Sequence, residues 1–105
     1  MMKVGICAIM KDVYEPYFTE WLNHHRSIGV DWFFIYDNDS AIPIISFDPD
    51  VVVYKISGIV KQISAYETCL ADLKSGVLPH CDRVAFIDED EFIICENGDI
   101  KKTLE

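Results

Sequence analysis

The sequence predicts a single α/β domain in which helices cover both faces of a mainly parallel β-sheet. The chain has 105 residues, which is enough for one domain with one hydrophobic core. Half of its residues are hydrophobic, as in packed globular proteins. Short apolar runs alternate along the chain with segments of helical periodicity. That alternation is typical of strand-helix-strand units, whose right-handed crossovers produce parallel strands.

Five apolar or β-branched runs are expected to form strands. The first is apolar throughout, which indicates a strand buried on both faces, and the last is short. A turn signal precedes the third, and another follows the last. In chain order the runs are residues 3–9, 32–36, 51–56 and 83–87, and then Phe92 to Cys95.

Two segments of helical periodicity separate these runs. The first begins either at a capping box of Asp12 with Glu15 or at Glu15 with Pro16 in its first turn, and Gly29 stops it after Ser27. Its buried face is expected to carry Tyr14, Phe18, Trp21, Leu22, His25 and Ile28. The second segment has apolar residues at helical spacing and is stopped by glycine and proline; its apolar positions are Ile63, Tyr66, Leu70, Leu73 and Val77.

Charge and hydropathy exclude two classes of partner. Eighteen acidic residues against nine basic ones give a net charge of -9, which repels nucleic acid and anionic membranes. No apolar run reaches the roughly 18 residues of a transmembrane helix, and the first residues lack the features of a signal peptide. We therefore expect a soluble, cytoplasmic protein without a transmembrane segment. A phosphorylated ligand would need a cation to offset the repulsion.

The four cysteines show no C-x-x-C pair and no disulfide framework, so we expect them to be reduced. A zinc site would have to combine His80 and Cys81 with His24 and His25, which lack a zinc-ligand spacing.

Polar clusters follow three of the predicted strands. They are Lys11-Asp12, Asp37-Asn38-Asp39-Ser40 and the acidic run Asp88-Glu89-Asp90-Glu91. Ligands of parallel sheets bind at the carboxyl ends of the strands, so the three clusters are expected to share one edge and form a site there.

The acidic run is the strongest candidate for a metal site. If the chain continues extended, Asp88 and Asp90 point to one side and Glu89 and Glu91 to the other. Two carboxylates about 5 Å apart repel by about 3 kcal/mol at an effective dielectric constant near 20, and a divalent cation removes that repulsion. Oxygen ligands favour Mg²⁺ or Mn²⁺. The alternative interpretation is a solvated turn.

The motifs together resemble the beginning of a glycosyltransferase of the family 2-like and family 92-like group. The resemblance extends over nearly the whole chain and is more specific than an Asp-x-Asp pair alone. It is carried by Met10-Lys11-Asp12, Glu15, Glu20-Trp21-Leu22, His24-His25, Gly29-Val30-Asp31, Tyr36-Asp37-Asn38-Asp39-Ser40, Gln62, Ala65-Tyr66, Cys69 and Phe86-Ile87-Asp88-Glu89-Asp90-Glu91-Phe92.

The resemblance implies a GT-A fold, with a Rossmann-like sheet that binds a nucleotide-sugar, and a metal held by Asp88 and Asp90. It places Asp88 near the ribose and Asp37 at the base. The remaining implied contacts to the nucleoside or the donor sugar are Lys11, Asp12, Glu15, Gln62 and Tyr66. The family more often has Asn at the position of Asp12.

Each of these residues also has a structural interpretation. The segment Asp37 to Ser40 is also typical of a hydrogen-bonded turn, and Lys11 with Glu15 of a surface ion pair. Gln62 is equally explained as a helix cap. Trp21 and Tyr66 are expected in the core, His25 in half-buried packing and His24 at the surface, since adjacent helical residues are not expected to face one partner.

In such transferases a second half follows the Asp-x-Asp region and carries the acceptor pocket and any catalytic base. We therefore expect residues 1–105 to be a nucleotide-sugar-binding domain, with the carbohydrate or other hydroxyl acceptor bound elsewhere. Sheet surface that the second half would cover would favour a homodimer. Two other functions stay open: a noncatalytic interaction or regulatory module, and a metal-dependent nucleotidyltransferase. A nucleotidyltransferase is disfavoured because no Gly-rich or basic loop follows the first strand.

Overall fold

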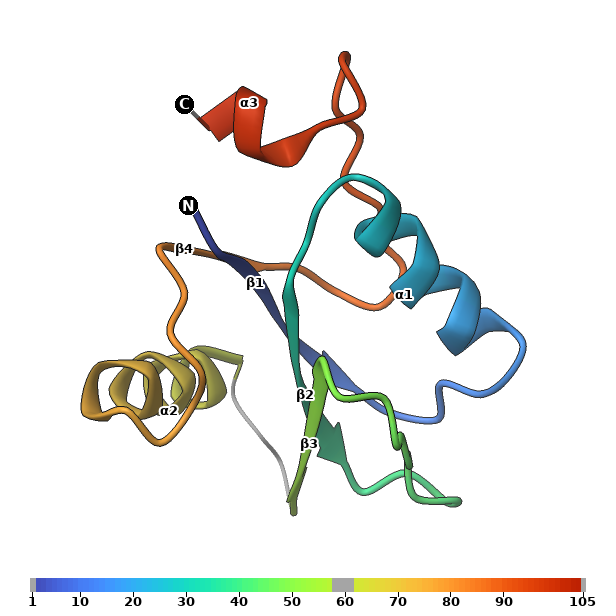
Figure 1. Ribbon diagram of the computed structural model, residues 1–105. Coiled ribbons are helices and arrows are strands. Elements are labelled where there is room, and N and C mark those ends of the chain that lie inside the picture. Colours follow the sequence, from blue (N-terminus) through green and yellow to red (C-terminus); the bar gives the residue numbers. More distant parts are fainter. Residues whose placement is uncertain (1, 58–61, 105) are drawn as a thin grey trace.

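The protein folds around a four-stranded parallel sheet, seen in a computed structural model that describes residues 2–57 and 62–104, without the side chains of 62–64. The strands lie in the order β3-β2-β1-β4, and each neighbouring pair is parallel. Their bounds are β1 Val4–Met10, β2 Trp32–Asn38, β3 Val51–Ile56 and β4 Arg83–Phe86. The predicted α/β class is therefore confirmed (Figure 1).

Two helices cover opposite faces of this sheet. The helix α1 (Tyr17–Ser27) connects β1 to β2, and α2 (Gln62–Ser75) connects β3 to β4. In Figure 1 the sheet separates them, with α1 to the right and α2 to the left. Both predicted strand-helix-strand units are thus present.

The core has two layers because β1 and β2 are buried on both faces. Trp21 of α1 packs with Ile6 and Phe33 in the layer on one face of the sheet, and Cys69 of α2 packs with Phe34 in the layer on the other. Odd and even positions of a strand point to opposite faces, so an unbroken apolar run supplies both layers. Burying a side chain such as Ile6, Phe33 or Phe34 contributes about 1.5 to 3 kcal/mol.

The ends of α1 follow from its flanking residues. The helix begins at Tyr17 with Pro16 as N-cap, so the predicted capping box of Asp12 with Glu15 is wrong. The Asp12 carboxylate is instead hydrogen-bonded to the amide of Ala41. At the other end, Gly29 has φ +105° and its amide donates to the carbonyl of Arg26, which is the predicted glycine stop.

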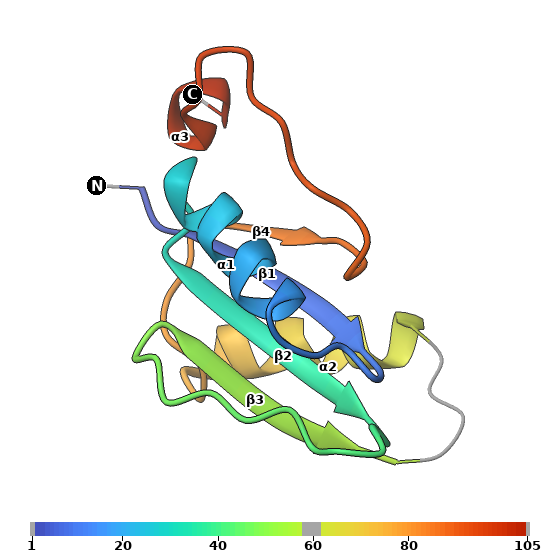
Figure 2. The same cartoon turned by 90° about the vertical axis from the view of Figure 1, so that its right-hand side faces the viewer.

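The chain after β4 runs back along α1 to the amino edge of the sheet. The predicted fifth strand, Phe92 to Cys95, is wrong, since this segment makes no ladder and its backbone bonds to side chains of α1 instead. A short helix, α3 (Ile100–Leu104), then follows. Its Ile100 amide donates at 2.7 Å to the carbonyl of Ile28, which lies at the end of α1. Figure 2 shows this return path beside α1.

Candidate functional site

The carboxyl ends of the parallel strands share one edge of the sheet, and the polar clusters lie there. In Figure 2 the arrowheads of β1, β2 and β3 point to the same edge. Lys11 and Asp12 follow β1, Asp37 and Asn38 end β2, and the acidic run begins two residues after β4. All four strands are parallel, so the three polar clusters that follow them are expected at the same edge.

Asp37 anchors the loop that follows β2. Its side chain is 3% exposed, and its carboxylate accepts hydrogen bonds from the Ser40 amide at 3.2 Å and the Ser40 hydroxyl. The other carboxylate oxygen accepts from the Ile44 amide at 2.9 Å. These donors satisfy a buried charge, so the structure shows the hydrogen-bonded turn among the two interpretations of this segment. Contact with a nucleotide base stays a prediction.

A small cavity lies beside Asp37 at the ends of β2 and β3. It has a volume of about 140 Å³ and is lined by Asp37, Asp39, Ser40, Pro43, Lys55, Ile56 and Ser57. Lys55 pairs with Asp37 in the strand register and brings a cation to this acidic edge.

Asp12 joins the loop after β1 to the loop after β2. Its carboxylate accepts from the Ala41 amide and from the Tyr14 hydroxyl, both at 2.8 Å, and its amide donates to the Ser40 hydroxyl at 2.9 Å. The bond from the Ala41 amide, then that from Tyr14, lowers the pKa of the Asp12 carboxyl below its usual range. Asp12 adopts φ 56°, a backbone conformation that Asp and Asn tolerate best among residues other than glycine.

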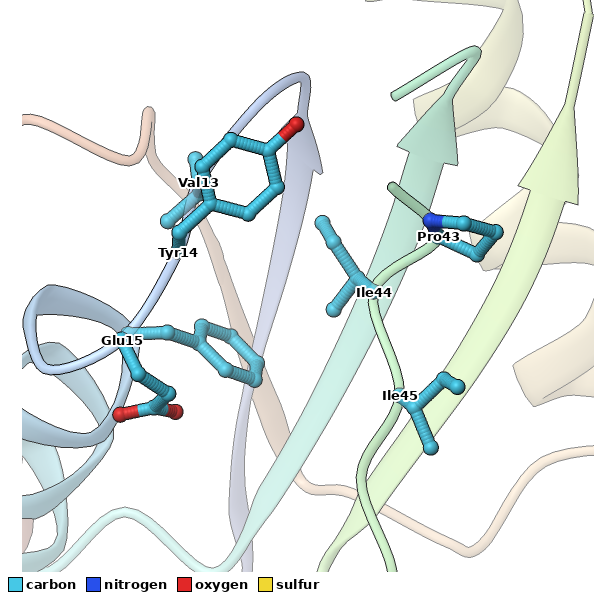
Figure 3. A pocket seen from close by; sticks show the side chains of 7 residues that line it. Val13, Tyr14, Glu15, Pro43, Ile44 and Ile45 are labelled. Atoms are coloured by element: carbon cyan, nitrogen blue, oxygen red, sulfur yellow. The ribbon is translucent and has the colours of Figure 1, made fainter. Parts of the chain in front are cut away.

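Glu15 lines a second cavity, which Figure 3 shows between the same two loops. The cavity has a volume of about 170 Å³ and mostly apolar walls: Val13, Tyr14, Glu15, Phe18, Pro43, Ile44 and Ile45. The Glu15 carboxylate also accepts the Thr19 amide at 3.3 Å, which supports the first turn of α1. Lys11 is exposed, and among the described residues it makes no ion pair with Glu15.

The acidic run forms a turn, so the prediction of an extended chain there is wrong. The Glu91 amide donates to the carbonyl of Asp88 at 3.1 Å, and the Glu91 carboxylate accepts the Asp88 amide at 2.8 Å. This reciprocal pairing gives one of the four carboxylates a donor, which an extended chain would not do. Strand alternation therefore does not place Asp88 and Asp90 side by side. Their role as metal ligands stays a prediction.

One stripe of α1 holds the backbone of the acidic turn in place. The Tyr17 hydroxyl donates to the carbonyl of Glu89, and the Trp21 indole donates to the carbonyl of Glu91 at 3.0 Å. Burial raises the pKa of the Tyr17 phenol above its usual value, and the charges of Asp90 and Glu89 add to the rise. The start of α1 therefore lies within the field of these two carboxylates.

The same stripe continues with the histidine pair, and both rings contact one residue. The His24 Nε2 atom lies 2.7 Å from the carbonyl oxygen of Ile93, and the Ile93 amide donates to the His25 Nε2 atom at 3.2 Å. The expectation that adjacent histidines do not face one partner is therefore wrong, because the partner offers its carbonyl to one ring and its amide to the other. The i, i+4, i+7, i+8 spacing of Tyr17, Trp21, His24 and His25 was the available sequence signal.

The remaining predicted residues lie in or near the core, or outside the described side chains. Trp21 is fully buried, and Tyr66 packs on Phe86 with ring centroids 4.4 Å apart, as expected for core residues. The side chain of Gln62 lies outside the described residues. All four cysteines are free, and His80 pairs with Asp82 at 3.1 Å.

A metal at the acidic turn would have few protein ligands. In residues 2–57 and 62–104, no three His, Cys, Asp or Glu side chains gather in a metal-binding arrangement. A closed zinc site needs such a group. Mg²⁺ and Mn²⁺ bind through one or two carboxylates together with water and phosphate oxygens, so the donor set offered by the half-buried Asp88 and the exposed Asp90 fits those ions.

Comparison with known proteins gives one relevant similarity. A glycosyltransferase family 92 protein of Ricinus communis is 30% identical over 96 residues, which cover 89% of this chain and 17% of that protein. The similarity supports a glycosyltransferase-like relationship. The chain spans only about a sixth of the length of this relative. No family model matches the chain, and no solved structure matches it. Within the described residues, every helix is too short or too polar to cross a membrane.

Proposed function

We propose that this chain is the nucleotide-sugar-binding part of a glycosyltransferase, which binds a UDP-sugar with Mn²⁺ or Mg²⁺ for transfer of the sugar to an acceptor hydroxyl. The observation that carries the proposal is the similarity to the family 92 protein over 89% of the chain. The parallel sheet supports it, because ligands of this architecture bind at the carboxyl edge of the sheet.

The proposal gives each part of the edge a separate task. Asp88 and Asp90 would hold the metal, which when bound neutralises the diphosphate and stabilises it as a leaving group. Asp37, fixed by Ser40 and Ile44, would present the loop after β2 to the nucleoside, next to Lys55. The acceptor and the base that activates its hydroxyl would come from parts of the transferase other than these residues.

Calorimetric titration of the 105-residue chain with UDP in the presence of Mn²⁺ tests the proposal. We expect saturable binding that Asp90→Asn weakens by at least tenfold, because one of two carboxylate ligands is lost. Glu96→Gln is the matched control: it removes one negative charge from an exposed position of the same C-terminal segment and should leave the affinity unchanged. Failure of the wild type to bind, or equal affinity of the wild type and Asp90→Asn, would contradict the proposed site.

A noncatalytic interaction module is the competing function, and the loop geometry favours it in one respect. The carboxylates of Asp12 and Asp37 are already engaged by backbone amides and neighbouring hydroxyls within their own loops. They are therefore fully explained as loop anchors. The two functions differ in whether Mn²⁺ and UDP stabilise the fold together.

A further inference from the structure

The buried histidine of α1 has a defined protonation state, which its two partners set. The Ile93 amide donates to His25 Nε2, so that nitrogen carries no proton. The Nδ1 atom lies 2.8 Å from the carbonyl oxygen of Trp21, so it carries the proton and donates. His25 is therefore neutral with its proton on Nδ1. A second proton would place an N–H against the N–H of Ile93.

The surroundings of the His25 ring favour the neutral form. The ring is fully buried, stacks on Phe92 at 5.8 Å between centroids and lies 4.7 Å from the Trp21 ring. Burial lowers the pKa of His25 below its usual value; the hydrogen bond to the Trp21 carbonyl opposes this shift, and His24 adds to it. Within residues 2–57 and 62–104, His24 is the titratable group that contacts the His25 ring. The returning segment contributes Phe92 and Ile93, and its Glu91 carboxylate is engaged by the Asp88 amide.

His24 holds the same residue in a different way. Its Nε2 atom faces the carbonyl oxygen of Ile93, so it donates. A doubly protonated His24 ring still donates from Nε2, whereas a doubly protonated His25 ring no longer accepts. Both adjacent rings therefore bond to the backbone of Ile93, but of these two hydrogen bonds only the one to His25 depends on pH. Ile93 lies two residues after Glu91, the last residue of the acidic turn, so these two contacts fix the chain that leaves the turn.

We infer that His25 is a positioning residue for Asp88 and Asp90, and that its neutral form holds the acidic turn in the geometry that binds the metal and the nucleotide. This inference rests on the proposed function for its ligand. The contact with Ile93 fixes one end of the turn, while Tyr17 and Trp21 fix the carbonyls of Glu89 and Glu91. Residues that orient ligands without touching the metal commonly contribute 10- to 100-fold to metal affinity.

The sign of the pH effect follows from the direction of the pKa shift. Because the folded pKa of His25 lies below its unfolded value of 6.5, the unfolded or opened state takes up the proton more readily. The contact is therefore fully stable above about pH 6.5, weakens as the pH falls below that value and is lost as it passes the folded pKa. Affinity for UDP with Mn²⁺ should fall over the same interval.

The inference is tested by measuring UDP affinity in the presence of Mn²⁺ at pH 7.5 and pH 5.0. We expect His25→Leu to bind at least tenfold more weakly than the wild type at pH 7.5. His25→Gln should recover most of the affinity, because its side-chain oxygen accepts from the Ile93 amide and does not titrate. The ratio of the affinity at pH 7.5 to the affinity at pH 5.0 should be smaller for His25→Gln than for the wild type. Titration of UDP itself affects both proteins equally, so it cancels when the two ratios are compared. His24→Gln is the comparison variant: it keeps His25, so its ratio should stay larger than that of His25→Gln.

Amide exchange of Ile93 in the wild type provides a measurement that needs no variant and no ligand. We expect this amide to be protected at pH 7.5 and to lose its protection as His25 takes up a proton, beyond the intrinsic change in exchange rate. Wild-type binding that His25→Leu leaves unchanged, or an Ile93 amide that is unprotected at pH 7.5, would overturn the positioning role. A wild type that binds no UDP at either pH, while Ile93 keeps its pH-dependent protection, would overturn the proposed function and with it the ligand role of His25. Only the pH-dependent contact between His25 and Ile93 would then stand.

Discussion

At the scale of single residues, the carboxylates of the sheet edge divide into two groups. Asp12 and Asp37 accept hydrogen bonds from the loop after β2, and they order that loop before any ligand arrives. Asp90, in contrast, is exposed at the tip of the acidic turn. A carboxylate with several donors is already stabilised as an anion, whereas an exposed one beside other carboxylates gains most from a cation. The charge available to a metal is therefore that of the turn.

Replacing Asp37 by Asn tests its role as an anchor. The amide nitrogen of Asn would face one of the donors from Ser40 or Ile44, leaving a buried N–H without an acceptor. We expect the free energy of unfolding to fall by about 1 to 3 kcal/mol in urea denaturation. Asp39→Asn, at the exposed neighbouring position, should cost less. Unchanged stability together with weaker UDP binding would show instead that Asp37 acts mainly on the ligand.

At the scale of elements, α1 both packs the core and positions the acidic turn. The structure confirms Phe18, Trp21 and Leu22 on the buried face that its periodicity predicts. The prediction was wrong for Tyr14, which precedes the helix and is exposed. The turn could not be predicted in the same way. Local alternation favours an extended chain after β4, and the bonds that hold the turn against α1 come from residues about 70 positions earlier in the sequence. The helical spacing of these residues marks a stripe of α1, but it does not identify the backbone groups that the stripe contacts.

Removing the hydroxyl of Tyr17 tests the contact between α1 and the acidic turn. Tyr17→Phe removes the donor to the Glu89 carbonyl but keeps a ring that packs edge-on against Phe92. We expect a loss of about 0.5 to 1.5 kcal/mol of stability, with faster amide exchange confined to the turn. Tyr14→Phe removes a hydroxyl bonded to Asp12 and should perturb the loop after β2 instead. Identical exchange patterns in the two variants would contradict a specific contact between α1 and the turn.

At the scale of the whole molecule, the sequence was sufficient for the parallel direction of the strands and insufficient for the path of the last segment. Alternating strands and helices leave few arrangements, so the parallel sheet could be predicted from pattern alone. The segment after β4 packs along α1 and ends where Lys101 pairs with Asp31 at 3.1 Å. That path depends on which surface of α1 remains uncovered, and this is known only once the sheet is assembled.

Because the net charge is -9, we expect the binding of a metal and the binding of a nucleotide to depend on each other. UDP alone meets a repulsive surface, and Mn²⁺ alone finds few protein ligands at the turn. Bound together, each supplies what the other lacks: the ion offsets the charge, and the diphosphate completes the coordination shell. With the Mn²⁺–UDP pair at about 100 times its dissociation constant from the protein, we expect the free energy of unfolding to rise by about 2.7 kcal/mol. For a domain of this size that corresponds to a rise of about 10 °C or more in the melting temperature.

Thermal melts with Mn²⁺, with UDP and with both distinguish the candidate functions. The nucleotide-sugar site predicts that the shift with both ligands exceeds the sum of the separate shifts, and that Asp90→Asn abolishes the excess while Glu96→Gln retains it. Screening of an acidic surface also raises the melting temperature, but it does so with Mn²⁺ alone and to the same extent in the two variants, since each removes one charge. An additive response that is equal in both variants would identify the acidic turn as a solvated surface and favour the noncatalytic module.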